Sequence, residues 1–542
     1  MGSYDPLTLA GVIEQWASAK PDLAVLVVEG AGVREDERRT YADLWENGRR
    51  LAAGLRQLGL APGDMVGTLL ANHVEFVDLM VAGSLLGIVL VPIDPRTRGD
   101  KLVFMLANAR CKGVVAGDYA LPELRRVREQ VAGLRWIVGL PTDEGRATAA
   151  QLQAAGVRPY GELAGVDLPV DPLPGSDPDR PMELIYTSGT TGDPKGIVLT
   201  HRRYCETSRI APFLFGFRPD DRLYSGLSLT HANAQVVTLG TSLVNAIPCV
   251  LSRRFSKSRL WDITRKYGCT SFTLLGGMTT AVYAEPPRPD DADNPVRSVI
   301  SAGMPAAIWN EFRARFGVEL HEFYGAAEGG LTGNPPGVGP VGSIGKPIPT
   351  FVHRIVDEEG RDVPKDARGE RVGELLFRHV DGSPYVVEYF GQPEASAQKC
   401  AGGWLHMGDV VREDADGWLY FLYRKGSGIR RNGEFIATPY IEKAIAELPE
   451  VDDVYVYGIP AASGVPGERD VVAAVVPKDA DLAAFDAQRL FRACRERLEP
   501  NFVPTYVQLL RVIPKTASEK PQDRFLVEAF HADPGAVHLE AR

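Results

Sequence analysis

The chain has 542 residues, of which 44% are hydrophobic and 24% charged, and its formal net charge is −10. This length exceeds what one hydrophobic core usually serves, so two or more domains are expected. The negative balance excludes a general nucleic-acid-binding protein, because neutralising phosphates requires a basic face. Small anionic ligands remain compatible, since a local pocket can be positive in an acidic protein.

The cysteines and the most apolar segment exclude further classes. No CxxC pair occurs among the cysteines, so they indicate neither a disulfide framework nor a zinc site, and a reducing cytoplasm fits them best. The first 20 residues lack a basic segment followed by an apolar core, so no signal peptide is expected. Residues 79–91 are too short to cross a bilayer and predict a buried helix running into a strand.

The first clear element is a helix that begins after Thr40. The Thr40 side chain can cap it, and Leu44, Leu51 and Leu55 recur on one side before Gly59 ends the pattern. Helix and strand patterns then alternate along the chain. This alternation predicts an α/β architecture with parallel sheets.

A connector rich in proline and aspartate, residues 168–181, is followed by a short strand at 182–186. Between about 345 and 425 the pattern changes to short strands with hairpin turns, at Glu359-Gly360 and Asp416-Gly417. From about 427 a compact α/β pattern begins, with an apolar helix face at 440–445 and strands at 454–459 and 471–476. We therefore predict a large domain of residues 1–425 and a small C-terminal domain of residues 426–542.

The segment YTSGTTGDPKG, residues 186–196, follows that short strand directly. Its glycines let backbone N–H groups approach phosphate oxygens, its hydroxyls donate further hydrogen bonds, and its lysine adds a point charge. It does not have the GxxxxGK[ST] spacing of a Walker loop, and a polar surface turn is the plainer alternative. The phosphate-binding candidates are Thr187, Ser188, Gly189, Thr190, Thr191, Gly192 and Lys195.

This loop resembles the signature loop of the adenylate-forming superfamily, which comprises acyl-CoA synthetases, peptide-synthetase adenylation domains and luciferases. Five further segments resemble family motifs in the family's order: SAGMP (301–305), EFYGAAEGG (322–330), GWLHMGDV (403–410), YRKGSGIRRNGEF (423–435) and PKTASEK (514–520). The resemblance covers nearly the whole chain. It implies a large N-terminal domain of α/β sheets with a small β-barrel-like subdomain, and a mobile small α/β C-terminal domain.

The resemblance also implies a nucleotide site. Asp409 has two carboxylate oxygens that can accept from both ribose hydroxyls, and Arg424 can donate to the same sugar. Tyr324 could stack on adenine, although an aromatic at such spacing is commonly a core residue. The ATP-binding residues implied in these segments are Ala302, Gly303, Glu322, Phe323, Tyr324, Gly325, Asp409 and Arg424.

The implied catalytic residues are Lys520, Glu328 and Lys195. Attack of a carboxylate on the α-phosphate brings two anions together, and the Lys520 ammonium would offset their repulsion in the transition state. Glu328 offers a hard oxygen ligand to Mg²⁺, making it the expected metal ligand. The implied reaction joins a carboxylate and ATP to acyl-AMP and diphosphate, and then transfers the acyl group to coenzyme A.

His231, in SLTHANAQ, resembles the residue that flanks the acyl pocket of CoA ligases, although a lone histidine is more often structural. By family position, four glycines also fall near this pocket, where missing side chains would leave room for a medium or bulky acid rather than acetate. Tight turns are the alternative explanation for them. They are Gly276, Gly277, Gly329 and Gly330.

The family's small domain rotates between the two half-reactions. The resemblance assigns the hinge to Gly426, and a tunnel for the coenzyme A thiol to Gly433 and Glu434. Several positions depart from the family: Ala327 replaces threonine, Glu519 replaces glycine, Gly426 replaces a charged residue, and Asn432 is unusual in its loop. These departures leave open a binding protein with weakened catalysis.

No aspartate stands near His231 to hold a substrate ammonium, and no carrier-domain pattern follows Lys520, so amino-acid activation is disfavoured. Acyl transfer to a carrier protein stays an alternative. Residues 286–297 and 316–325 resemble the crotonobetaine/carnitine-CoA ligase-like and fatty-acid-transport-type branch. The expected partners are a small carboxylic acid, ATP and coenzyme A, with no nucleic acid, no membrane span, a cytoplasmic location, and a homodimer left open.

Overall fold

The computed structural model describes residues 4–166, 177–187, 194–425, 429–431, 434–436, 438–462, 469–479, 481–516 and 519–540. These residues fall into two compact units. The first comprises Met1–Ser256, Asp262–Thr273 and Val387–Gln398, and the second comprises Lys257–Trp261, Leu274–Val386 and Lys399–Arg542. No helix among the described residues is long and apolar enough to span a membrane.

The first unit begins with helices α1 (Leu9–Ala19), α2 (Tyr41–Gln57) and α3 (Val74–Leu86). Thr40 caps α2 as predicted: its hydroxyl accepts from the Asp43 N–H at 3.1 Å, and the Asp43 carboxylate accepts from the Thr40 N–H at 2.8 Å. This capping box satisfies two backbone donors that would otherwise lack partners. The predicted helix-to-strand segment is also confirmed, as α3 followed by β4.

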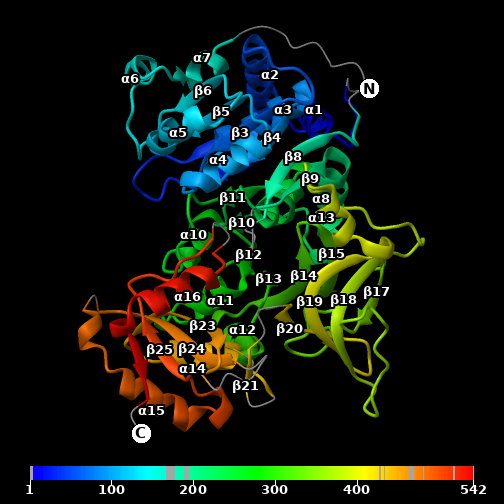
Figure 1. Ribbon diagram of the computed structural model, residues 1–542. Coiled ribbons are helices and arrows are strands. Elements are labelled where there is room, and N and C mark those ends of the chain that lie inside the picture. The colour runs from blue at the N-terminus through cyan, green and yellow to red at the C-terminus, as the bar shows by residue number, and fades with distance from the viewer. Residues whose placement is uncertain are drawn as a thin grey trace. The chain divides into compact units, whose positions relative to one another are not determined.

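A seven-stranded sheet forms the centre of this unit, in the order β7-β6-β5-β3-β4-β8-β9 (Figure 1). Neighbouring strands run parallel except β9, which is antiparallel to β8. The predicted alternation of helices and strands is therefore confirmed. The strands are β3 (Met65–Leu69), β4 (Val89–Pro92), β5 (Gly113–Gly117), β6 (Trp136–Leu140), β7 (Arg158–Pro159), β8 (Pro181–Tyr186) and β9 (Gly196–Thr200).

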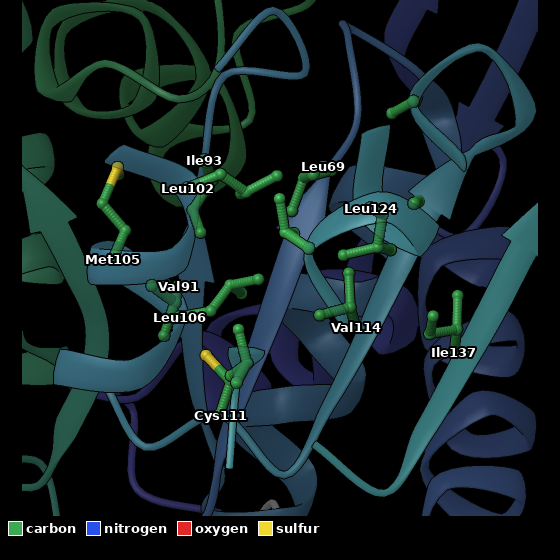
Figure 2. Packing of buried hydrophobic residues seen from close by; sticks show 14 of the residues in the cluster. Leu69, Val91, Ile93, Leu102, Met105, Leu106, Cys111, Val114, Leu124 and Ile137 are labelled. Carbon is green, nitrogen blue, oxygen red and sulfur yellow. The ribbon is translucent and has the colours of Figure 1, made fainter. Parts of the chain in front are cut away.

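An apolar cluster covers one face of this sheet (Figure 2). Strand residues such as Leu69, Val91 and Val114 pack against Leu106 of α4 (Gly99–Asn108) and Leu124 of α5 (Leu121–Val127). Each such side chain contributes about 1.5–3 kcal/mol when it is fully buried. Leu184 and Tyr186 of β8 belong to the same cluster, so the strand that leads into the predicted phosphate-binding loop is firmly anchored.

A second sheet of this unit contains β10 (Leu223–Ser225), β11 (Cys249–Leu251), β1 (Ala24–Val28) and β2 (Glu37–Thr40), in that order. Helix α8 (His201–Phe215), a π-helix (Asn233–Gly240) and α9 (Thr241–Asn245) lie between β9 and β11 in the chain. A π-helix is rare and often marks a functional segment. Here it follows His231 almost directly.

The second unit opens with α11 (Gly276–Tyr283), β13 (Ser298–Ala302) and α12 (Trp309–Phe316). Strand β14 (Glu319–Ala326) runs parallel to β13, and β15 (Gly329–Asn334) turns back antiparallel to β14. A four-stranded antiparallel sheet follows, in the order β17 (Phe351–Val356), β18 (Arg371–His379), β19 (Leu405–Glu413) and β20 (Leu419–Arg424). The predicted hairpin turns are present, with left-handed backbone at Gly360 and Gly417.

The C-terminal part of the second unit is a small α/β domain, as predicted. Its sheet has the order β23 (Val451–Pro460), β24 (Arg469–Pro477), β25 (Tyr506–Leu509) and β26 (Val537–Leu539). Helices α14 (Thr438–Ala446), α15 (Ala487–Arg497) and α16 (Asp523–Ala532) accompany it. Ile441 and Ile445 of α14 and Phe491 of α15 are buried in one apolar cluster with Val456 and Val475 of the sheet.

Candidate active site

The predicted phosphate-binding loop begins where β8 ends. Tyr186 donates to the Asn108 side chain at 2.5 Å, and the Thr187 N–H donates to the Lys195 carbonyl at 3.0 Å, closing the base of the loop. The Lys195 ammonium lies 5.0 Å from the centre of the Tyr389 ring, a cation–π contact within the first unit. Five predicted loop residues, Ser188, Gly189, Thr190, Thr191 and Gly192, lie outside the described residues.

His231 lies half-buried in the segment between β10 and the π-helix. Its N–H donates to the Ser228 carbonyl at 3.0 Å, and its carbonyl accepts from the Gln235 N–H at 3.1 Å. The buried Asn72 holds the preceding residues, donating to the Leu227 carbonyl and accepting from the Leu229 N–H, both at 2.8 Å. Asn72 thus ties the residues that precede His231 to the rest of the first unit.

In the second unit, Ala302 ends β13 and Gly303 adopts a left-handed φ of +100°. The buried Glu322 carboxylate of β14 accepts from the N–H groups of Gly303 at 2.6 Å and Met304 at 3.1 Å. Burial raises the pKa of Glu322 to about 8, against the opposing effect of these two N–H donors. Glu322 therefore orders the 302–304 loop from within the protein, a task the sequence did not indicate.

Asp409 and Arg424 are register partners on β19 and β20. Asp409 is 6% exposed; one carboxylate oxygen accepts from the Tyr324 hydroxyl at 2.5 Å, and the other lies 3.7 Å from Arg424 Nη1. Burial raises the pKa of Asp409, while Arg424 and the Tyr324 hydroxyl oppose that rise. Phe323, adjacent on β14, is buried and Gly325 is exposed.

Lys520 and Glu328 belong to the same neighbourhood. Glu328 lies in the turn between β14 and β15 and is 8% exposed. The Lys520 N–H donates to the Thr516 hydroxyl at 3.2 Å, and the Thr516 N–H donates to the Lys520 carbonyl at 2.8 Å. Lys520 is exposed, and partial desolvation lowers the pKa of its ammonium. Arg424 lowers it further, whereas Asp409 and Glu328 raise it.

Lys399 is a neighbour of this cluster that we did not predict. It is the last residue of α13 (Pro393–Lys399), and its ammonium donates to the Met407 carbonyl at 3.3 Å. Burial lowers the pKa of Lys399, and the carboxylates of Glu328 and Asp409 oppose that shift. A lone lysine at a helix end carries no motif, so only the fold could have revealed it.

The glycines assigned to the acyl pocket differ from one another. A side chain at Gly329 would collide with the Tyr385 hydroxyl, and one at Gly330 would lie 2.6 Å from Phe377 and 2.9 Å from Met407. These two positions therefore make room for protein side chains and for a turn with φ of +127° and +67°. Gly276 and Gly277 begin α11. A Cβ atom added at Gly276 would lie 3.1 Å from the Gly303 carbonyl oxygen, and one added at Gly277 would lie 3.6 Å from the Glu519 carbonyl oxygen.

Three other predictions concern the hinge and the coenzyme A tunnel. Gly426 and Gly433 lie outside the described residues, and Glu434 is described only as backbone in the short strand β22 (Glu434–Phe435). Of the departures from the family, Ala327 lies beside Glu328 in the β14–β15 turn. Glu519, where the family has glycine, adopts a left-handed φ of +58°.

Together, the second unit offers a buried carboxylate with a hydroxyl and a guanidinium beside it, a second carboxylate, and two ammonium groups. Such a set can bind a ligand that carries both hydroxyls and phosphates, because Asp409 accepts hydrogen bonds while Lys520 and Lys399 offset negative charge. The described structure brings Tyr324, Glu328, Asp409, Arg424 and Lys520 together.

The fold is that of adenylate-forming enzymes, and the chain belongs to the AMP-binding enzyme family, which it matches over residues 13–382. Residues 440–520 match the C-terminal domain of AMP-binding enzymes.

Curated relatives cover most of the chain. It is 31% identical to the medium/long-chain-fatty-acid–CoA ligase FadD17 of Mycobacterium marinum, over 94% of this chain and 96% of that protein. It is 28% identical to human long-chain fatty acid transport protein 1, over 95% and 81%, and 28% identical to crotonobetaine/carnitine–CoA ligase of Salmonella typhi, over 89% and 91%. The family resemblance inferred from the motifs is confirmed.

Solved structures share the fold. The anthranilate CoA ligase AuaEII, in complex with anthranoyl-AMP, superposes with a TM-score of 0.81 over 99% of both chains at 22% identity. A fatty acyl CoA synthetase of Mycobacterium tuberculosis superposes with a TM-score of 0.65 at 25% identity, over 97% of this chain and 99% of that one.

Proposed function

We propose that the protein is an AMP-forming acyl-CoA ligase. In the first half-reaction a carboxylate oxygen attacks the α-phosphorus of ATP, the bond to the β-phosphate oxygen breaks, and diphosphate leaves. In the second, the thiol sulfur of coenzyme A attacks the acyl carbon of acyl-AMP, AMP leaves and the thiol proton is released. The observation that carries this proposal is the cluster of Asp409, Arg424, Glu328 and Lys520.

The nucleotide would bind through groups that the family motifs carry. We assign the ribose hydroxyls to the Asp409 carboxylate, which Tyr324 and Arg424 hold in place. The face of Tyr324 and the 302–304 loop ordered by Glu322 are proposed to contact adenine. The phosphates are assigned to the loop that starts at Thr187 and ends at Lys195, through backbone N–H groups, hydroxyls and the ammonium.

Glu328 and Lys520 are proposed to support the chemistry. The buried Glu328 carboxylate is a hard oxygen donor that fits Mg²⁺, which when bound neutralises phosphate oxygens. Lys520 would offset the charge that builds as the carboxylate approaches the α-phosphate. The nearby carboxylates of Asp409 and Glu328 favour its charged form, which this role requires.

We further propose that residues 426–542 form the mobile domain and residues 1–425 the large domain. In one orientation Lys520 would face the α-phosphate. In the other, Gly433 and Glu434 would line the path of the coenzyme A thiol, with Gly426 as the hinge. The match of residues 440–520 to the family's C-terminal domain supports a separate small domain.

The acid is proposed to be of medium or long chain, or otherwise bulky. The names of the FadD17 and fatty-acid transport relatives support this choice. Gly329 and Gly330 do not, because protein side chains fill the space beside them. Acetate turning over faster than every acid of six or more carbons would refute the proposal.

One assay tests the reaction. The enzyme is incubated with ATP, Mg²⁺ and a panel of carboxylic acids, with and without coenzyme A, and AMP, acyl-AMP and acyl-CoA are measured. Acyl-CoA that forms only with coenzyme A supports the proposal. Acyl-AMP that accumulates despite coenzyme A indicates transfer to a carrier protein, and nucleotide binding without either product indicates a binding protein.

A further inference from the structure

Glu183 is a buried carboxyl group that the proposed chemistry does not use. It lies in the middle of β8, opposite Leu90 of β4 and Leu199 of β9, and it is 0% exposed. Because side chains alternate along a strand, Glu183 points away from the apolar cluster that Leu184 and Tyr186 join.

Glu183 and Gln235, on the π-helix, are both fully buried. Neither carboxyl oxygen of Glu183 has a hydrogen-bond partner among the described residues, and the same holds for the amide oxygen of Gln235 on the π-helix. The Gln235 amide nonetheless lies close enough to the Glu183 carboxyl to influence its pKa. The amide nitrogen of Gln235 is already engaged, since it donates to the Leu229 carbonyl at 2.7 Å.

No cation balances this carboxyl within the described part of the unit. Strands β4 and β9 and the π-helix carry no titratable side chain. Helix α8 carries the buried His201, Tyr204 and Cys205; burial lowers the pKa of His201 to about 4, so it is neutral, and Tyr204, which acts electrostatically on Glu183, donates its hydroxyl to the Gln235 carbonyl at 3.2 Å. An ionised carboxylate in such a place would be unpaired and costly. Burial accordingly raises the pKa of Glu183 to about 8, and the Gln235 amide opposes only part of that rise.

We infer that Glu183 is held as a neutral carboxylic acid whose O–H donates to the Gln235 amide oxygen, so that it positions the segment carrying His231 against the strand that leads into the 187–195 loop. The proton of the neutral Glu183 carboxyl supplies the hydrogen-bond donor that the oxygens of Glu183 and the Gln235 amide otherwise lack. Gln235 links Glu183 to the segment that carries His231, because its side-chain amide donates to the Leu229 carbonyl and its backbone N–H donates to the His231 carbonyl. The positioning role rests on the proposed function, whereas the neutral acid does not.

Proton linkage tests the neutral acid without any substrate. In the unfolded chain a glutamate ionises near pH 4.3, so a folded-state pKa of about 8 means that unfolding releases one proton between these values. The wild-type Tm should therefore fall relative to that of Glu183→Gln as pH rises from 5 to 8, and the difference should then level off. Glu129→Gln, at an exposed position, is the matched control and should show no such trend.

Infrared difference spectroscopy of the full chain provides a second readout. A carboxylic-acid carbonyl band present at pH 7, absent from Glu183→Gln and lost from the wild type above pH 8, is expected. A wild-type Tm that keeps a constant offset from Glu183→Gln between pH 5 and 8, together with no such band, would overturn the inference.

Single-turnover formation of acyl-AMP tests the positioning role. At pH 7, Glu183→Gln should stay within about threefold of the wild type because its amide also donates, whereas Glu183→Leu should lose tenfold or more while folded. The wild-type rate should fall above pH 8, and the rate of Glu183→Gln should not. The double variant Glu183→Gln, Gln235→Glu should restore an acid–amide pair and, with it, the fall in the rate of acyl-AMP formation above pH 8.

These outcomes separate the two proposals. Equal rates in Glu183→Leu and the wild type would overturn the positioning role even if the proton linkage holds. If the wild type forms no acyl-AMP with any acid, the proposed function fails, and the Tm and infrared data alone still decide whether Glu183 is neutral.

Discussion

At the level of single residues, the candidate site combines carboxylates with cationic side chains where water is partly excluded. The Asp409 carboxylate is buried beside Arg424 and Tyr324, and the exposed Lys520 is influenced by two carboxylates, those of Asp409 and Glu328. Each group therefore has a partner that favours its charged form against the cost of burial. This balance is what a site for a charged, phosphorylated ligand requires.

Lys520→Ala should slow acyl-AMP formation by about 100-fold or more and leave the Kd for ATP within about threefold of the wild type. The reason is that this ammonium is proposed to act mainly on charge that develops in the transition state. Single-turnover assays and equilibrium binding of ATP measure the two effects. Lys478→Ala, at an exposed position of the same domain, serves as the control. Adenylation at the wild-type rate in Lys520→Ala would contradict the assignment.

Glu519→Gly should stabilise the protein by up to about 1 kcal/mol. Glu519 has a φ of +58°, which costs an L-residue about 1–2 kcal/mol, and part of the relief is offset by the greater freedom of glycine in the unfolded chain. Glu528→Gly, within helix α16, should instead destabilise by about 1 kcal/mol. Urea unfolding of both variants measures the sign, and a loss of stability in both would show that the backbone strain at 519 is not relieved.

At the level of elements, the β14–β15 hairpin brings Glu328 to the site. Its turn is tight because Gly329 and Gly330 leave space that Tyr385, Phe377 and Met407 occupy. The hairpin is therefore held by packing against β18 and β19 residues as well as by its own hydrogen bonds. Sequence position alone suggested an open pocket here, and the packing gives these glycines a structural role.

Gly330→Ala should lower the free energy of unfolding by about 1–3 kcal/mol more than Gly360→Ala does. Both glycines have a left-handed φ, so both substitutions carry the backbone cost of about 1–2 kcal/mol. Only at position 330 does the added methyl group meet side chains, at 2.6 Å from Phe377 and 2.9 Å from Met407, whereas nothing lies within 4 Å at position 360. Equal losses in urea unfolding would mean that the hairpin is not tightly packed.

At the level of the whole molecule, the proposed reaction uses one site for two steps, with the C-terminal domain in a different orientation for each. Rotation of that kind concentrates large φ and ψ changes in very few residues. Gly426, at the family's hinge position, tolerates both signs of φ at little steric cost. Backbone freedom would then replace the charged side chain of its relatives.

Gly426→Pro should impair one half-reaction far more than the other, with thioester formation the more affected. Proline restricts φ to about −65° and removes an N–H donor. Single-turnover formation of acyl-AMP and its consumption by coenzyme A measure the two steps separately. Gly417→Pro would disrupt the β19–β20 turn, so Gly428→Pro is the better comparison and tests the next candidate hinge. Wild-type rates for both steps in Gly426→Pro would exclude this residue as the pivot.

Much of the architecture could be predicted from short-range patterns. The Thr40 cap, the apolar spacing of α2, the helix-to-strand run at 79–91 and the turns at Gly360 and Gly417 all depend on residues a few positions apart. Capping, periodicity and turn preferences act over such distances, so the sequence alone determined these elements. The family segments, recognised by their order along the chain, likewise identified Asp409, Arg424 and Lys520 as candidate site residues.

Only the tertiary structure decided which of these groups share partners. The Tyr324 hydroxyl binds Asp409 across 85 positions of the chain, Lys399 joins the same cluster from the end of a helix, and Glu183 meets Gln235 inside the first unit. Burial and desolvation depend on what packs around a side chain from distant segments, and no local pattern encodes that. The sequence likewise identified the glycines at 329 and 330. Only the packing of side chains from distant segments shows that the space beside them is filled.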